Sequence, residues 1–175
     1  LGDLNRMAFT IFFATSTGKT EDVADRLKEL LPGTEAKDVD SIGGVDDLTS
    51  AEALICCVPT WNTGADEARS GTAWDDLVQE IPDQDFAGKP VAILGLGDSS
   101  GYSDFFCDAM EELHSAFVSA GAKVIGKTAT DGYTYDDSKS VIDGKFCGLP
   151  LDEDNESELT DQRLNAWITQ IQSEA

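Results

Sequence analysis

The sequence predicts an α/β domain in which one parallel sheet is covered by helices on both faces. Three apolar runs carry this prediction: MAFTIFFA at 7–14, ALICCV at 53–58 and VAILGL at 91–96. Runs without polar alternation are typical of strands that are buried on both faces. Helical patterns separate the runs, and right-handed crossovers between parallel strands make the architecture doubly wound.

The first half of the chain alternates between strands and helices. Residues 19–31 follow the strand at 7–14 and form an amphipathic helix, which a Pro-Gly pair ends. A weaker strand is predicted at 36–39, before the buried strand at 53–58. Residues 73–80 have a helical pattern. The apolar residues that recur in the first helix are Val23, Leu27, Leu30 and Leu31.

The second half continues the pattern. The strand at 91–96 is followed by a long helix at 103–120, which a glycine ends, and by a fifth strand that begins at 123–127. A final amphipathic helix is predicted at 157–173. In such folds, ligands bind at the carboxyl ends of the strands. The loops after the first, third and fourth strands are therefore the candidate site.

Composition restricts the possible functions. Acidic residues outnumber basic residues 34 to 12, and the net charge of −22 argues against nucleic-acid binding and suits a basic protein partner. No Cys-x-x-Cys pair is present and His114 is the only histidine, so we expect no metal site and no catalytic constellation. No apolar run approaches the ~18 residues of a membrane span. We expect one domain over 7–175, and a leader or cloning remnant at 1–6.

The loop after the first strand, TSTGKT at 15–20, ends in the residues of a nucleotide-binding P-loop. A Walker A loop also needs a glycine at position 13, where this chain has Phe13. Hydroxyl side chains and backbone N–H groups instead gather at a helix N-terminus, which suits a small terminal phosphate. An ordinary Ser/Thr helix cap is the alternative.

Each of the other two loops presents an aromatic residue. PTWNTG follows the third strand and contains Trp61, and GLGDSSGY follows the fourth and ends at Tyr102. The second of these fails as a dinucleotide fingerprint, because Ser100 occupies the position of the last glycine. A flat ring between Trp61 and Tyr102, with its phosphate in the first loop, accounts for all three loops. For Trp61, packing on a neighbouring helix is the alternative.

Taken together, the motifs TSTGKT, PTWN-x-G and GLGD-x-x-GY-x-D-x-F resemble those of flavodoxins, which carry electrons on flavin mononucleotide (FMN). The resemblance extends from about residue 7 to the final helix. It implies a five-stranded parallel sheet of order 2-1-3-4-5. The fifth strand is split by an inserted loop between 123–127 and 146–151, as in the long-chain subgroup.

The resemblance also implies a role for each loop. Residues 15–20 would hold the FMN phosphate, Trp61 and Tyr102 would flank the isoalloxazine, and the Asn62-Thr63 peptide would lie beside flavin N5. Asp98 would face the pyrimidine edge, and Asp154 would lie near the ribityl chain. The full set of expected cofactor-binding residues is Thr15, Ser16, Thr17, Gly18, Lys19, Thr20, Thr60, Trp61, Asn62, Thr63, Gly64, Leu96, Gly97, Asp98, Tyr102, Phe105 and Asp154.

Two features depart from the family pattern. Phe105 replaces an asparagine of the family motif, so any cofactor contact there must come from the backbone. The stretch 64–71 is a few residues longer than usual. Both changes lie at the rim of the expected cofactor site.

The resemblance implies a low-potential electron carrier, not an enzyme, that shuttles between the semiquinone and hydroquinone of FMN. Ferredoxin–NADP reductase and photosystem I are the implied partners, and a monomer in the bacterial cytoplasm or algal plastid stroma is the expected state. An FMN-dependent quinone reductase is the alternative, although the sequence has no basic cluster for NADPH phosphates. A phosphoacceptor domain would need acids where Thr15, Ser16, Pro59 and Thr60 stand.

Overall fold

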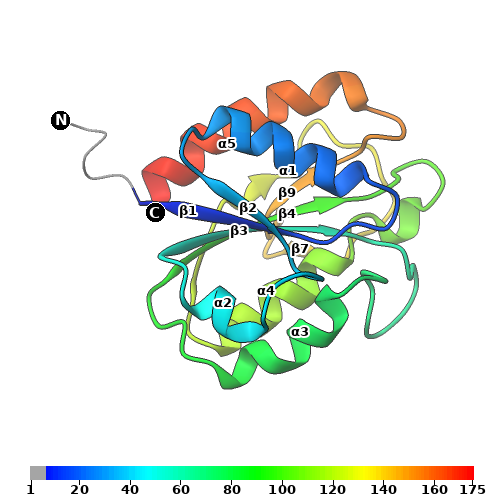
Figure 1. The fold of residues 1–175 in the computed structure, drawn as a ribbon. Coiled ribbons are helices and arrows are strands. Elements are labelled where there is room, and N and C mark those ends of the chain that lie inside the picture. Colours follow the sequence, from blue (N-terminus) through cyan, green and yellow to red (C-terminus); the bar gives the residue numbers. More distant parts are fainter. Residues whose placement is uncertain (1–6) are drawn as a thin grey trace.

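The computed structural model describes residues 7–175, so the prediction for residues 1–6 lies outside them. A parallel sheet of order β2-β1-β3-β4-β5 forms the centre, which confirms the predicted fold class. Helices α1 and α5 cover one face, and α2, α3 and α4 cover the other (Figure 1). The sheet strands are β1 (Phe9–Phe13), β2 (Glu35–Asp38), β3 (Ala53–Pro59), β4 (Pro90–Leu96), β5 (Lys123–Ile125) and β9 (Leu149–Leu151); the helices are α1 (Lys19–Leu30), α2 (Val45–Thr49), α3 (Trp74–Glu80), α4 (Ala109–Ser119) and α5 (Thr160–Glu174).

Two apolar cores lie on opposite faces of the sheet, because successive side chains of a strand point to opposite sides. Every residue of β3 and β4 is buried, as expected of central parallel strands. Cys56 packs in the core beneath α3 and α4, and Cys57 packs in the core beneath α1 and α5. All four cysteines are free and buried, and burial raises the pKa of the Cys57 thiol.

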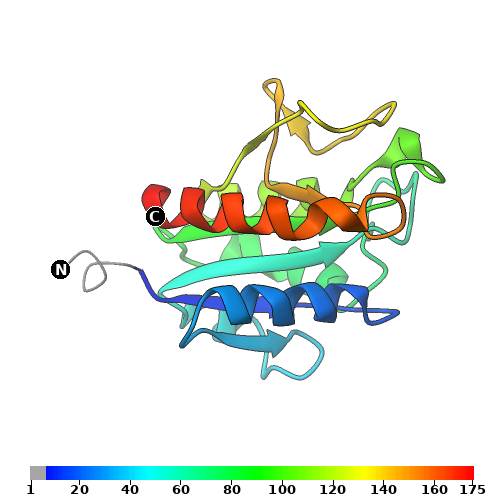
Figure 2. The ribbon, with the colours of Figure 1, turned by 90° about the horizontal axis from the view of Figure 1, so that it is seen from above.

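The fifth strand is split, as predicted. Its first half, β5, pairs with Pro90–Ala92 of β4, and its second half, β9, pairs with Leu94–Leu96 of the same strand. The intervening chain extends away from the sheet edge and forms a small antiparallel sheet (Figure 2). The second half begins later than the predicted residue 146, because Phe146 pairs within this small sheet. The strands of the small sheet are β6 (Thr128–Ala129), β7 (Val141–Ile142) and β8 (Lys145–Phe146).

The predicted helix at 103–120 is wrong in its first part. A single 3-10 turn covers Ser103–Phe105, and α4 begins only at Ala109. Between them Cys107 has a φ of 54°, which is outside the right-handed helical region. The hydroxyls of Ser138 and Ser140 donate to the carbonyl oxygens of Phe106 and Cys107, at 2.5 and 2.6 Å. The inserted loop thus satisfies groups that a continuous helix would have bonded internally.

The short helix α2 is not predicted from the sequence, since Leu48 is its only buried residue and five residues give no periodicity. Within residues 7–175, none of the helices combines the length and apolarity needed to cross a bilayer.

Candidate functional site

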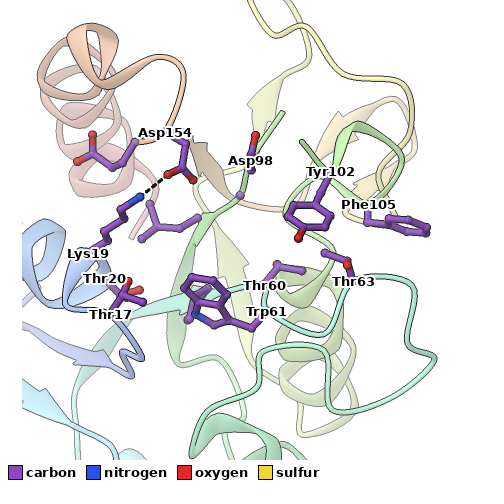
Figure 3. A pocket seen from close by; sticks show the side chains of 14 residues that line it. Thr17, Lys19, Thr20, Thr60, Trp61, Thr63, Asp98, Tyr102, Phe105 and Asp154 are labelled. Carbon is purple, nitrogen blue, oxygen red and sulfur yellow. Dashed lines mark hydrogen bonds and ion pairs between the residues drawn. The ribbon is translucent and has the colours of Figure 1, made fainter. Parts of the chain in front are cut away.

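A cleft opens at the carboxyl ends of β1, β3 and β4, where the three candidate loops meet (Figure 3). Its walls come from the loops that precede α1, follow β3 and follow β4, together with the segment after β9. Such a position is where parallel α/β sheets bind their ligands. The residues that line it are Thr17, Lys19, Thr20, Pro59, Thr60, Trp61, Thr63, Leu96, Gly97, Asp98, Tyr102, Phe105, Glu153 and Asp154.

The first loop turns into α1 at Gly18, whose φ of 95° favours glycine. The Gly18 N–H donates to Thr15 Oγ1 at 2.8 Å, so Thr15 holds the turn from within. No side chain caps the N-terminus of α1. The amides of its first turn are therefore available to an anion, and Thr17 and Thr20 add hydroxyls at the cleft wall.

Lys19 leaves this loop and reaches the segment after β9. Its ammonium forms an ion pair with Asp154, which raises the pKa of Lys19 (Figure 3). The neighbouring Glu153 accepts from Arg26 Nη1 at 3.1 Å. These pairs bind α1 to the segment after β9, so the donors that the first loop leaves for a ligand are mainly neutral.

Trp61 and Tyr102 lie on separate loops at the mouth of the cleft (Figure 3). Their residues are 49% and 53% exposed, although large aromatic side chains are usually buried. Each ring thus leaves an apolar face in water that a planar ligand could cover. The alternative of Trp61 packing on a neighbouring helix does not account for the exposure of Trp61.

Asp98 shapes the turn between β4 and Tyr102. Its Oδ1 accepts from the amides of Ser100 and Gly101 and from Asn155 Nδ2, at 3.1, 2.7 and 2.8 Å. The Gly101 amide is the main cause of a lowered Asp98 pKa, so the carboxylate is ionised at neutral pH. A negative charge therefore lies at the cleft wall.

The loop after β3 is held by the longer stretch at 64–71. The amides of Trp61 and Asn62 donate to the Arg69 carbonyl at 3.2 and 3.0 Å, and Asn62 Nδ2 donates to the Ala68 carbonyl at 2.6 Å. Asn62 therefore uses its amide group for support. Phe105 lines the cleft and packs near Gly64, where an added Cβ would be 3.5 Å from the Phe105 ring.

Most of the expected residues line the cleft, and a few do not. Pro59 and Glu153 also line it and were missed, although Pro59 ends the third strand and Glu153 adjoins Asp154 in LDEDN. Proximity to a predicted site residue was the available signal for both. The expected residues that do not line the cleft are Thr15, Ser16, Gly18, Asn62 and Gly64.

Known proteins share this sequence and fold. The flavodoxin family model matches residues 11–167. A flavodoxin from Nostoc sp. is 43% identical, with 94% of this chain and 95% of that protein covered. Flavodoxin 1 of Escherichia coli is 38% identical, with 96% and 95% covered. The crystal structure of Fusobacterium nucleatum flavodoxin bound to flavin mononucleotide has a TM-score of 0.87 at 35% identity, with 96% of this chain and 98% of that one covered. The chain belongs to the flavodoxin family.

Proposed function

We propose that this chain is an electron carrier that binds FMN non-covalently in the cleft. The observation that carries the proposal is the pair of exposed rings, Trp61 and Tyr102, beside an uncapped helix N-terminus. A flat ring joined to a phosphate matches both features. The donor set fits a phosphate monoester, since hydroxyls and amides predominate and Lys19 is already paired.

Each part of the cleft has a role in this proposal. The backbone of residues 15–20 and the hydroxyls of Thr17 and Thr20 hold the phosphate. Trp61 and Tyr102 orient the ring and exclude water from it, and the Asn62-Thr63 peptide lies beside flavin N5. Asp98 and its neighbouring backbone face the pyrimidine edge, and Asp154 lies near the ribityl chain. When bound, FMN supplies the one-electron chemistry.

The charge around the cleft favours a strongly reducing carrier. Asp98 lines it without a cationic partner among residues 7–175. Glu153 and Asp154 line it in pairs with Arg26 and Lys19, and the whole chain has a net charge of −22. Negative charges oppose the arrival of further negative charge on a ligand, and in a partly dehydrated site this effect is weakly screened. The low potential therefore follows from the surroundings of the ring.

The test is the visible spectrum of the purified protein and an FMN titration of the flavin-free chain. We expect flavin absorption bands, quenching of Trp61 fluorescence on binding, and a roughly tenfold higher Kd in Trp61→Ala. Val118→Ala is the matched control, since Val118 is 52% exposed on α4 and lies outside the cleft lining. Absence of FMN uptake would overturn the proposal, and NADH-driven quinone turnover by the protein alone would favour a quinone reductase.

We further propose that the chain works as a monomer whose partners are basic redox proteins such as ferredoxin–NADP reductase and photosystem I. The support is the acidic surface, which attracts a basic protein and repels a second copy. Reduction by a basic reductase should slow as ionic strength rises above about 0.1 M, because the Debye length falls below about 10 Å. A stopped-flow rate that does not change over this range would contradict electrostatic attraction.

The proposed location is a reducing compartment, either bacterial cytoplasm or plastid stroma. The support is the set of four free, buried thiols, which need no oxidising environment. The proposed domain spans residues 7–175. Fractionation of the source cells, with antibody detection of the protein, tests the compartment.

A further inference from the structure

The stretch at 64–71 closes around the guanidinium of Arg69. Arg69 Nε donates to the Ala65 carbonyl at 3.2 Å, and Nη2 donates to the Asp66 carbonyl at 3.1 Å. The Arg69 residue is only 9% exposed, although arginine is usually a surface residue. A buried charge of this kind is stable only when its donors are paired.

The same guanidinium joins this stretch to α4. Arg69 Nη1 donates to Glu111 Oε2 at 2.6 Å and to the Asp108 carbonyl at 3.2 Å. Glu112 accepts from the backbone amides of Ala68 and Arg69, at 3.1 and 2.6 Å. We call Arg69, Glu111 and Glu112 the Arg69 clamp. It holds Ala68 at a φ of 54°, a conformation that alanine rarely adopts.

The clamp extends to the cleft through the backbone of residue 69. The Arg69 carbonyl accepts from both the Trp61 and the Asn62 amides, and Asn62 Nδ2 binds the adjacent Ala68 carbonyl. The Trp61-Asn62 backbone is thus linked to α4 through the backbone and side chain of Arg69. Other charges near the clamp are Asp66, Asp108 and Lys139, and Lys139 Nζ donates to the Ala65 carbonyl at 3.4 Å.

We infer that Arg69 is a positioning residue that fixes the Trp61-Asn62 backbone, and with it the indole and the peptide proposed to lie beside the flavin. The effect on the flavin rests on the proposed function, whereas the effect on the backbone does not. Arg69 acts through the loop and does not itself line the cleft.

Arginine is needed at this place because of its geometry as well as its charge. The guanidinium reaches two loop carbonyls, the Asp108 carbonyl and the Glu111 carboxylate at once. A lysine ammonium offers three donors from one atom and cannot span these acceptors. Arg69→Lys therefore keeps the charge and loses the positioning, which separates the two effects.

The first experiment measures amide hydrogen exchange in the full chain, with and without FMN. In Arg69→Gln and Arg69→Lys, the Trp61 and Asn62 amides should exchange at least about tenfold faster, because charge-assisted bonds that hold their acceptor are lost. Arg163→Gln is the matched control. Arg163 has a side chain that is 12% exposed, against 11% for Arg69, and it pairs with Glu156 away from this loop.

The second experiment measures the FMN Kd and the reduction potential of the loaded protein. Both Arg69 variants should bind FMN roughly tenfold more weakly and show a shifted potential, while Arg163→Gln retains the wild-type values. If Arg69→Gln does not fold, Glu112→Gln tests the same link with Arg69 still paired to Glu111. Glu112→Gln should likewise speed exchange of the Trp61 and Asn62 amides and raise the FMN Kd.

Two outcomes would overturn the inference. One is an Arg69→Lys protein that matches the wild type while Arg69→Gln does not, since charge alone would then explain the effect. The other is a set of variants that lose stability but retain wild-type exchange at Trp61 and Asn62. A wild-type chain that does not take up FMN would refute the proposed function, and the exchange measurement would still decide the role of Arg69.

Discussion

Asp152 shows how one buried carboxylate can support two loops of the cleft. It is 0% exposed and accepts from the Ser99 amide and hydroxyl on one side. On the other side it accepts from the amides of Asp154 and Asn155, at 3.1 and 2.9 Å, and from the Asn155 side chain. The loop after β4 and the segment after β9 are therefore joined by a residue that does not line the cleft itself.

Asp152→Asn should lower the free energy of unfolding by about 2–3 kcal/mol, since an amide cannot accept from all of these donors and a buried donor is left unpaired. Burial opposes ionisation of Asp152, but hydrogen bonds from Ser99 and Asn155 outweigh it and lower the pKa. The carboxylate thus stabilises the fold above its ordinary pKa of about 4, and this stabilisation is lost as the pH falls through the lower folded-state pKa.

Urea unfolding at a series of pH values checks this prediction. The wild type should lose stability below about pH 4 more steeply than Asp152→Asn. Asp136→Asn is the control, because Asp136 is exposed and accepts one hydrogen bond, from Ser103 Oγ at 2.8 Å. Equal losses of unfolding free energy in Asp152→Asn and Asp136→Asn at neutral pH would contradict the role of Asp152.

Gly71 lies directly against the proposed flavin-stacking residue. A Cβ at this position would be 2.9 Å from Trp61 Cβ, and the φ of 68° already favours glycine. Gly71→Ala should therefore displace Trp61 and weaken FMN binding about tenfold or more. Gly88 is the matched control, with a φ of 72° and open space around an added Cβ.

Titration with FMN distinguishes the two glycine variants. Both should lose about 1–2 kcal/mol of stability from the left-handed backbone alone. Only Gly71→Ala should also raise the FMN Kd. Equal affinities in Gly71→Ala and Gly88→Ala would show that the contact with Trp61 does not position the ring.

At the scale of elements, the buried strands and the longer helices were predictable because each depends on its own apolar pattern. The buried runs that became β1, β3 and β4 are examples, and so is the period of α1. The start of α4 was not predictable, because Ser138 and Ser140, from a distant part of the chain, bind the carbonyls of Phe106 and Cys107 just before the helix. The supporting role of Asn62 was missed for the same reason, since its partner is the Ala68 carbonyl of an atypical loop.

The return of the inserted loop to the sheet depends on Gly148. A Cβ there would meet the Ile93 carbonyl oxygen at 2.0 Å, and a backbone atom of the central sheet cannot move aside at small cost. Gly148→Ala should therefore destabilise the fold by about 3 kcal/mol and separate β9 from β4. Gly144, in the same loop, has a φ of 83° and no atom within 4 Å of an added Cβ.

Thermal unfolding of Gly148→Ala and Gly144→Ala tests this pair. Only the control carries the cost of a left-handed alanine, because Gly148 does not have a positive φ, so any excess loss in Gly148→Ala is a lower bound on the cost of the steric contact. A Tm for Gly148→Ala at or above that of Gly144→Ala would mean that β9 can shift at no more than the cost of a left-handed alanine, which would contradict the predicted loss. Amide exchange in β9 then shows whether its pairing with β4 persists.

The charge of the whole molecule opposes its own compactness. The chain has twelve basic residues and 34 acidic ones. Ion pairs already occupy several of the basic residues, among them Lys19, Arg26, Arg69, Lys139 and Arg163. The remaining carboxylates repel one another, and salt screens that repulsion. Stability should therefore rise with ionic strength.

Between about 0.01 and 0.5 M NaCl, over which the Debye length falls from about 30 Å to below 8 Å, we expect the Tm to rise by roughly 2–4 °C or more. A parallel series in choline chloride separates screening from sodium binding. A Tm that falls with salt in both series would mean that the ion pairs outweigh the general repulsion.

The divided fifth strand also affects how the sheet meets other chains. An exposed strand edge is a template on which a second molecule can add its own strand and start aggregation. Here that edge consists of two three-residue segments, β5 and β9, with the insertion projecting between them. The opposite edge, β2, has four residues, of which Glu35, Lys37 and Asp38 are charged. Neither edge of the described sheet offers a long apolar row for strand addition, so the interruption protects a concentrated protein from sheet-to-sheet assembly.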